Sequence, residues 1–340
     1  MASVGHWDSL AEAEKLVQSV LVSGIIEENI KAGGLIGSGL LPIAQFSGKS
    51  AKWNRESTIP TAANFDIGAA LAWQSASKTS LQETNLKRIY VQTLLDGFVE
   101  EVYTNENYYQ AIQLMQDKKA MLQKIENDLI YGDLTFSPDN LEFDGLHALC
   151  EASGTNFNGD SVDIEQSGAL SLANMRLLED RMLHGVDAWL FPKVIARRMD
   201  SMLQEDGITT AVFGSLGFTI DQIGNRITMW NGTPIIRSDY LVAETNDTGE
   251  GSDRRAKNTS GTNWSIFALK FGQVMQAQPG LTYAFGNTKS QGDFWKTVFF
   301  PDLEDMDASG LRMVHYGALL DGSTVACGRI TDVTDAKIVI

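Results

Sequence analysis

Histidines are the first residues whose chemistry could suggest a metal or acid–base site, and the chain has four: His6, His147, His184 and His315. None stands in an HExxH or similar metal-ligand spacing, and an isolated histidine is usually structural. Residues 213–217 read FGSLG, which lacks the G-x-S-x-G spacing of a nucleophile elbow. Residues 246–253 are acidic but do not match the positions of a calcium loop. We therefore predict no catalytic, cofactor-binding or metal site.

Two further patterns could indicate chemistry. Residues 47–50 read SGKS, like the end of a phosphate-binding loop, but Ile43 stands where that loop requires a glycine. We predict a strand with a turn or bulge at Gly48 instead. Glu126 and Asp128 are two residues apart on a predicted helix, so their side chains face different directions. An enzyme with an unrecognised acidic site stays open as an alternative, because carboxylates can also pair across the folded chain.

Composition indicates a globular protein with a sizeable core: 340 residues, 43% hydrophobic, with a mean hydropathy of -0.12. The 27 basic and 43 acidic residues give a net charge of -16, so the surface repels phosphates and binding to nucleic acid by charge neutralisation is not expected. No apolar run approaches the length of a membrane span, and we predict no membrane partner. Cys150 and Cys327 are too few for a disulfide framework and are predicted to be buried and reduced.

A long one-sided helix is predicted over residues 105–131. Six apolar residues recur at three- and four-residue steps: Tyr108, Ile112, Met115, Leu122, Ile125 and Leu129. This spacing places them on one face, and polar residues such as Asp117 fall on the other. Thr104 or Asn105 can cap the start. Gly132 is predicted to end the helix by adopting a positive φ.

The flanking segments also carry local signals. A capping box at Ser9 to Glu12 predicts a helix over residues 10–31. Residues 57–84 form a long loop with isolated apolar side chains, which favours a role in assembly. Leu94, Leu95 and Phe98 predict a short helix leading into the long one. The later elements are a helix over 172–182, a strand over 187–191, a helix over 192–205, strands on both sides of a turn over 227–236, a polar loop over 244–263, and strands over 264–271, 298–301, 311–319 and 323–330.

The order of several short motifs resembles one family. The long helix ends in IYGD (130–133), followed by Pro138 and FDGL (143–146). The second half contains WLFP (189–192), GTPIIRSD (232–239), SIFALKFG (265–272) and HYGA (315–318) in that order. This succession is similar to major capsid proteins of tailed phages of the Hong Kong 97 (HK97-like) type, whose spine helix the long helix resembles.

The resemblance implies an α+β, HK97-like capsid fold. It divides the chain into an N-terminal arm (1–47), an extended E-loop (48–88), a peripheral domain with the spine helix (89–160), an axial domain (161–305) and return strands shared by the two domains (306–340). Solitary apolar side chains on the E-loop would then anchor it on a neighbouring subunit. The interface candidates are Arg55, Phe65, Leu71, Trp73 and Leu81.

The function implied is that of a major capsid protein, not an enzyme. It would assemble with itself into pentamers and hexamers of an icosahedral phage head that encloses double-stranded DNA without sequence-specific binding. The same resemblance implies a separate scaffolding protein, a portal and decoration proteins as partners, no cofactor, and assembly in the host cytoplasm into a virion. An encapsulin-type nanocompartment shell shares the fold and is the alternative within this class.

Overall fold

The computed structural model describes residues 28–57, 59–71, 73, 79–98, 109–135, 141–153, 156, 158–205, 216–220, 226–246, 255–257, 261–286, 294–301, 303–304 and 306–339. The chain is α+β, as predicted. Most of the helix predicted over residues 10–31 and both proposed caps of the long helix lie outside the described residues. Residues 28–31, the described end of that prediction, are not helical.

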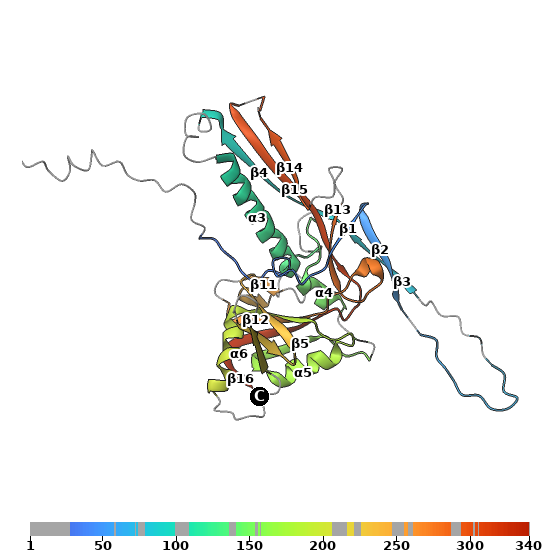
Figure 1. Ribbon diagram of the computed structural model, residues 1–340. Helices are drawn as coiled ribbons and strands as arrows, with labels where there is room; N and C mark the ends of the chain where they lie inside the picture. The colour runs from blue at the N-terminus through green and yellow to red at the C-terminus, as the bar shows by residue number, and fades with distance from the viewer. Residues whose placement is uncertain are drawn as a thin grey trace, which may run out of the picture.

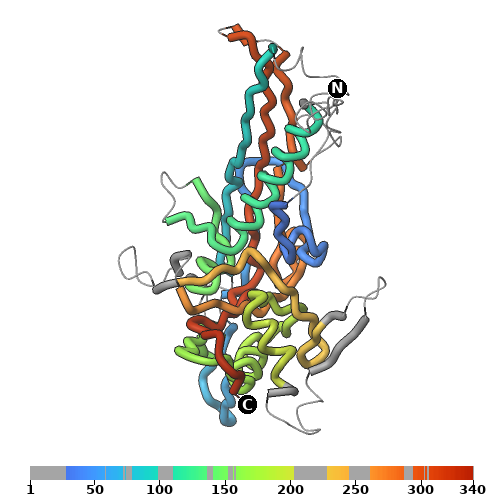
Figure 2. The backbone as a smooth tube through the Cα atoms, turned by 90° about the vertical axis from the view of Figure 1, so that its left-hand side faces the viewer, coloured from blue at the N-terminus to red at the C-terminus, as the bar shows by residue number. Residues whose placement is uncertain are grey.

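A first sheet forms the elongated part of the molecule seen above the centre of Figure 1. Its central strand is the longest in the sheet and pairs antiparallel with three others along different parts of its length. Figure 2 shows two of these strands, β4 and β15, running together beside α3. The five strands are β1 (Ile43–Phe46), β4 (Lys87–Asp96), β13 (Leu281–Gly286), β14 (Lys296–Phe300) and β15 (Ala308–Asp321).

Two outcomes for this sheet differ from the predictions. Leu94 and Leu95 belong to β4 and not to a helix, because β4 pairs with β15 through residue 96. Strands β13 and β14 fall inside the 161–305 segment, yet they pair with β15 in the same sheet as β4. The chain therefore returns to the first sheet before residue 305. The division into five segments otherwise stays a prediction.

Helix α3 (Tyr109–Tyr131) lies along one face of the first sheet (Figure 1), and this confirms the long helix. Its buried side includes Met121, Ile125 and Leu129, each 0% exposed. The predicted orientation is wrong in the first half of the helix. Met115 is 63% exposed, whereas Asp117 is 2% exposed and accepts hydrogen bonds from Thr93 and Gln113. The apolar repeat predicted the wrong buried face here, because the buried face of the helix includes the hydrogen-bonded carboxylate of Asp117.

The end of α3 requires glycine for a reason other than the predicted positive φ. Gly132 is absent from the residues with positive φ. Instead, a Cβ at Gly132 would collide with the backbone oxygens of Asp128 and Phe143. A Cβ at Gly145 would lie 2.5 Å from the Asp128 oxygen, and the Gly145 N–H donates to Gly132 O at 2.8 Å. The two glycines thus let the returning chain press directly against the last turn of the helix.

A second sheet, with nine strands in the described chain, forms the lower part of the molecule in Figure 1. Helices α5 (Leu172–Arg181) and α6 (Lys193–Glu205) pack on it, chiefly against β16, and the short helix α4 (Leu146–Ser153) lies between β16 and α3. Its strands are β5 (Asp163–Ser171), β6 (Ala188–Pro192), β7 (Leu216–Ile220), β8 (Arg226–Trp230), β9 (Thr233–Ser238), β10 (Glu244–Asn246), β11 (Arg255–Lys257), β12 (Asn263–Leu269) and β16 (Cys327–Val339).

The strand–turn–strand prediction over residues 227–236 is confirmed by β8 and β9. Asn231 and Gly232 join them with φ of 47° and 86°, the left-handed conformations that a tight hairpin turn needs. Helix α5 confirms the helix over residues 172–182. Cys150 and Cys327 are both free and buried, as predicted.

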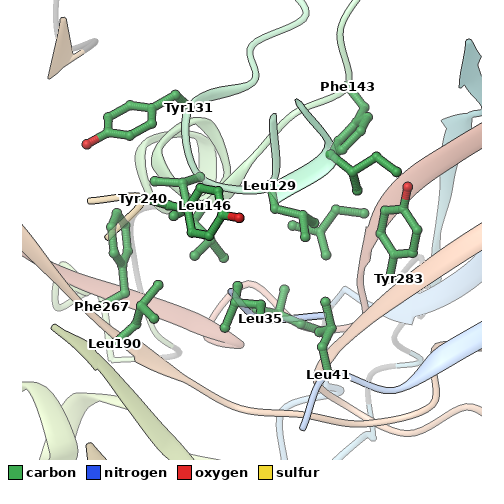
Figure 3. Packing of buried hydrophobic residues seen from close by; sticks show 14 of the residues in the cluster. Leu35, Leu41, Leu129, Tyr131, Phe143, Leu146, Leu190, Tyr240, Phe267 and Tyr283 are labelled. Carbon is green, nitrogen blue, oxygen red and sulfur yellow. The ribbon is translucent and has the colours of Figure 1, made fainter. Parts of the chain in front are cut away.

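One hydrophobic cluster joins the two sheets (Figure 3). Leu129 and Leu146 enter it from α3 and α4, Leu190 and Phe267 come from the second sheet, and Tyr283 comes from the first. All five residues are 0% exposed. Burying such side chains contributes roughly 1.5–3 kcal/mol each. The two sheets are therefore held together by a shared core.

A buried carboxylate lies beside this core, at the start of the segment predicted to be a polar loop. Glu244 is 3% exposed and accepts hydrogen bonds from Tyr131 Oη at 2.9 Å and Ser265 Oγ at 2.6 Å. Residues 244–246 pair with residues 255–257 as β10 and β11. The prediction of an exposed loop over 244–263 is thus wrong at its start, because the buried partners of Glu244 come from distant parts of the chain.

The neighbours of Glu244 indicate which ring nitrogen of His147 donates and which accepts. The Arg329 guanidinium, which can only donate, lies 3.2 Å from His147 Nδ1. Nδ1 must therefore accept, and the proton on Nε2 is donated to Glu244 at 3.1 Å. Arg329 also forms an ion pair with Asp163 at 2.7 Å. Burial acts to raise the pKa of Glu244, but His147 and the other donors outweigh it and hold the pKa below its usual value.

Candidate assembly interface

A two-stranded ribbon carries the long loop predicted from the sequence. Strands β2 (Ser50–Glu56) and β3 (Thr79–Asn85) pair antiparallel over their full lengths, from Ser50 with Asn85 to Glu56 with Thr79. The turn predicted at Gly48 is present, with a φ of 132°. Figure 1 shows that the loop between β2 and β3 extends away from both sheets. An isolated pair of strands is marginally stable in water, so this ribbon needs support at its base.

The base is held by a small apolar cluster and an ion pair. Ala51 is buried with Phe46 and Leu320, and half-buried Trp53 packs against them. Arg55 Nη2 donates to the Asp321 backbone oxygen at 2.7 Å and pairs with its carboxylate at 3.1 Å. Burial raises the pKa of the Asp321 carboxyl, and Arg55 opposes that rise. Arg55, predicted as an interface residue, therefore contacts its own chain.

The other four interface candidates have large exposed side chains. Phe65 is 70% exposed, Leu71 67%, Trp73 101% and Leu81 63%. They are separated along the ribbon and loop, so they form no core of their own. In a single chain these side chains contact mainly solvent, although aromatic residues of this kind commonly anchor protein interfaces. Their role as anchors stays a prediction.

Ile67 is a further strongly exposed apolar residue of the loop that was not selected from the sequence. Ile67 is 101% exposed and lies in a turn closed by the hydrogen bond from Ala69 N–H to Asp66 O at 3.1 Å. Gly68 completes this turn with a φ of 82°. The Asp-Ile-Gly order at residues 66–68 was an available turn signal, because aspartate and glycine favour such positions. A turn that presents an isoleucine to solvent suits contact with another surface.

The first sheet also carries an exposed apolar strip, which was not predicted from the sequence. On β4, the side chains opposite the buried Ile89 include Tyr90, 71% exposed, and Leu94, 53% exposed. Phe300 lies across β15 on the same face, and Arg312 covers its ring at 5.1 Å from the centroid. The alternation of residues 89–94 could have indicated this face, but only with the helix prediction for Leu94 set aside.

The carboxylates of Glu126 and Asp128 on α3 both bind groups of the same chain. Both oxygens of Glu126 accept backbone N–H groups, from Leu35 at 2.8 Å, Ile36 at 2.9 Å and Gly37 at 3.0 Å. Asp128 pairs with Lys124 at 2.7 Å. Burial raises the pKa of the Glu126 carboxyl, and the three backbone donors oppose that rise. These contacts explain both carboxylates without a substrate.

The buried histidines are likewise explained by neighbours. The His315 ring is stacked on Tyr283, with Nδ1 2.6 Å from Phe294 O and Nε2 2.6 Å from the Tyr283 hydroxyl. Because a carbonyl only accepts, Nδ1 carries the proton and Nε2 accepts from the tyrosine. Burial lowers the pKa of His315 to about 4. Within the described residues, no group of three or more His, Cys, Asp and Glu side chains could hold a metal ion.

None of the described helices combines the length and the apolar character needed to cross a bilayer.

Comparison with known proteins finds likeness in structure and not in sequence. No protein-family model matches the chain, and no curated protein matches it. The holo-SrpI encapsulin complex of Synechococcus elongatus is similar with a TM-score of 0.67 at 12% identity, covering 99% of each chain. The capsid of a native GTA particle has a TM-score of 0.63 at 9% identity, covering 97% of this chain and 100% of that one. Microbacterium phage Oxtober96 has a TM-score of 0.59 at 13% identity, covering 96% and 98%.

Proposed function

We propose that this chain, which has the HK97-like fold found in phage capsids, a GTA capsid and an encapsulin, is a shell subunit that assembles with copies of itself. The observation that carries the proposal is the ribbon with its loop. It holds Phe65, Ile67, Leu71 and Trp73 in solvent, where each is at least 67% exposed. Such side chains gain stability only when a second molecule covers them.

The ribbon suits this role mechanically. Its base is fixed by the pairing of Arg55 with Asp321, while its apolar side chains lie on the part that extends outward. Each subunit would give its own loop to one neighbour and receive the loop of another. Contacts of modest strength repeated around a closed shell then add up to an assembly far tighter than any single interface.

The first experiment removes two anchors. Trp73→Ala and Phe65→Ala should each leave the thermal melting of the free subunit unchanged, because both rings are exposed in the single chain. Each can cost up to a few kcal/mol at an interface if the ring fills a pocket of the partner. We expect folded subunits or small oligomers that no longer close into particles, as measured by light scattering and negative-stain microscopy.

Leu183→Ala is the matched control, because Leu183 is 52% exposed but lies after α5, far from the ribbon in sequence. It should assemble normally. If the two aromatic variants form normal shells, these residues are not the anchors. If they unfold the free subunit, the loop belongs to an internal core and the proposal fails.

The finer proposal is a major capsid protein of a tailed-phage head, built from pentamers and hexamers around double-stranded DNA. Its support is the order of the sequence motifs together with the net charge of -16. A negatively charged shell can enclose DNA without binding its phosphates. A separate scaffolding protein, a portal and decoration proteins belong to this proposal, as do assembly in the host cytoplasm and a place in the virion.

An encapsulin-type compartment is the second candidate, favoured by the TM-score of 0.67 with the SrpI encapsulin complex. The contents of the particles distinguish the two. Shells purified from the native host and treated with nuclease should retain protected double-stranded DNA if the chain is a capsid protein. Recovery of a single co-purifying protein cargo and no protected DNA would instead support the encapsulin function.

A further inference from the structure

Residues 32–37 pass the end of α3 nearest the second sheet (Figure 1) and are hydrogen-bonded to both. We call this segment the strap. In its second half, the backbone N–H groups of residues 35–37 bind the Glu126 carboxylate on α3. At its start, the Ala32 N–H donates to Asp239 Oδ2 at 2.9 Å, and Ala32 O accepts from the Asp239 N–H at 3.0 Å. Asp239 directly follows β9, so the strap connects the helix on the first sheet with a strand of the second.

Two adjacent glycines let the strap approach both of its partners closely. Gly33 has a φ of 74°, and a Cβ there would collide with the backbone oxygen of Arg237 in β9. A Cβ at Gly34 would collide with the Glu126 carboxylate instead. A larger residue at either position would therefore have to move away from one partner. The strap thus fits between β9 and α3 with no room for a methyl group on either glycine.

The strap is also anchored in the core that joins the two sheets. Leu35 is 1% exposed and belongs to that cluster, where Figure 3 shows it among side chains from both sheets. The second sheet has a further cluster of its own, which includes Met175, Trp189 and Ile330. Helix α3 in turn packs on β4 and β15 of the first sheet. Each sheet therefore has packing that does not involve the strap.

Helix α3 also contacts the second sheet at its last residue, where the Tyr131 hydroxyl donates to Glu244 at 2.9 Å. Glu126 and Tyr131 are five residues apart, which is about 7.5 Å along a helix. The apolar contacts of the shared core have no preferred direction, whereas hydrogen bonds do. A helix held at one directional contact can turn about it, but two such contacts fix its direction. The strap supplies the second contact.

We propose that the strap sets the orientation of α3 and the first sheet relative to the second sheet. With the strap in place, the two sheets keep one orientation. When the strap is displaced, they turn relative to each other about the end of α3, and each keeps its own fold. Rigid-body rotation of this kind is a common form of conformational change. The inference concerns a single chain and does not rest on shell assembly.

Gly33→Ala tests the close approach of the strap to β9, and Gly39→Ala is its matched control. Both glycines have a positive φ, 74° and 68°, so alanine is strained to a similar extent at each. A Cβ at Gly33 meets the backbone of Arg237, whereas nothing lies within 4 Å of a Cβ at Gly39. Only Gly33→Ala should therefore push the strap away from the second sheet.

A milder pair of variants covers the case in which the glycine variant does not fold. Asp239→Ala removes the carboxylate that accepts the Ala32 N–H and also pairs with a lysine. Asp335→Ala removes a comparable ion pair of the second sheet, with Arg198 at 2.6 Å, whose partners do not include the strap. The two aspartate side chains are similarly exposed, 25% and 30%. A difference between these variants therefore reports on the strap contact.

The readout is the distance between the two sheets in the full-length chain. Met115→Cys on α3 and Leu183→Cys after α5 place one spin label on each part, and both positions are exposed. Cys150 and Cys327 are buried and react little with the labelling reagent. Labelled chain is mixed with excess unlabelled chain, so pulsed electron paramagnetic resonance measures distances within one chain.

Gly33→Ala and Asp239→Ala should each broaden the distance distribution at least about twofold, with the circular dichroism of the wild type retained. Gly39→Ala and Asp335→Ala should give the wild-type distribution. A wild-type distribution in every strap variant that folds would refute the proposal. Equal broadening in the two controls would also overturn it, because loss of any contact would then be enough to loosen the two sheets.

Discussion

Replacing Glu126 with glutamine tests how the segment before β1 is held on α3. The side chain is 3% exposed, and its two oxygens accept three backbone N–H groups at 2.8 to 3.0 Å. In Glu126→Gln the amide oxygen can keep the two bonds that Oε1 makes to Ile36 and Gly37. The amide nitrogen then faces the Leu35 N–H, donor against donor.

The expected cost follows from these contacts. One hydrogen bond to a charged acceptor is lost, roughly 1.5–3 kcal/mol, and a buried N–H is left without an acceptor, roughly 1–3 kcal/mol. The two terms overlap, so we expect a loss of about 2–4 kcal/mol in the free energy of unfolding. Urea denaturation of the unassembled subunit measures it.

The control is Glu83→Gln, the same chemical change at an exposed position. Glu83 pairs with Lys52 at 3.0 Å on the open ribbon. Exposed pairs of this kind contribute little, so the variant should unfold at nearly the wild-type urea concentration. Equal, small losses in both variants would refute the reasoning, because they would mean that Glu126 is solvated and does not hold the segment.

Three further predictions concern other parts of the fold. Burial lowers the pKa of His315 from 6.5 to about 4, so between these pH values the unfolded chain binds more protons than the folded one. The free energy of unfolding should therefore fall by about 3 kcal/mol as the pH is lowered from 6.5 to 4. A His315→Gln variant should lack this component in urea titrations at several pH values. Gly145→Ala should lose about 1–3 kcal/mol because its Cβ meets backbone atoms, whereas Gly168→Ala, with open space around its Cβ, should unfold like the wild type in thermal melting. Leu129→Ala should lose about 2–5 kcal/mol and Asp117→Ala about 1–3 kcal/mol in urea denaturation, and a negligible loss for Asp117→Ala would contradict its place on the buried side of α3.

Elements with strong local signals could be predicted from the sequence. The helix over residues 109–131 has a long apolar repeat, and the hairpin at Asn231-Gly232 has the residue pair that its turn requires. The order of motifs also led to the correct fold. The signals for the helix and the hairpin lie within a few residues of one another, so one sequence contains them in full.

Features that depend on distant partners could not be predicted. Asp117 and Glu126 looked like surface residues because periodicity assigns polar side chains to the outside. Their burial depends on hydrogen-bond donors elsewhere in the chain, such as the N–H of Leu35 for Glu126 and the hydroxyl of Thr93 for Asp117. The spacing of Leu94 and Leu95 fits a helix or a strand equally, and only pairing with β15 decides between them.

The candidate interface shows the same limit. Isolated aromatics such as Trp73 could be recognised as exposed, because no neighbouring apolar residues can enclose them locally. The contact of Arg55 with its own chain could not be predicted, because its partner Asp321 is 266 residues away. Ile67 was overlooked because a single isoleucine in a polar stretch resembles an ordinary loop residue.

The pairing of β4 with β15 has a consequence for how the chain is made. Gln92 and Arg312, which meet across these strands, are 220 residues apart in sequence. Strand β1 likewise pairs with β13, which is synthesised much later. A nascent chain on the ribosome therefore cannot complete the first sheet until residues 308–321 have emerged. Until then β4 keeps an unpaired edge, and such edges attract other chains. Interrupted translation products would lack the central strand, which pairs with β4 and also contacts α3. Only a chain synthesised through residue 321 can therefore complete the first sheet.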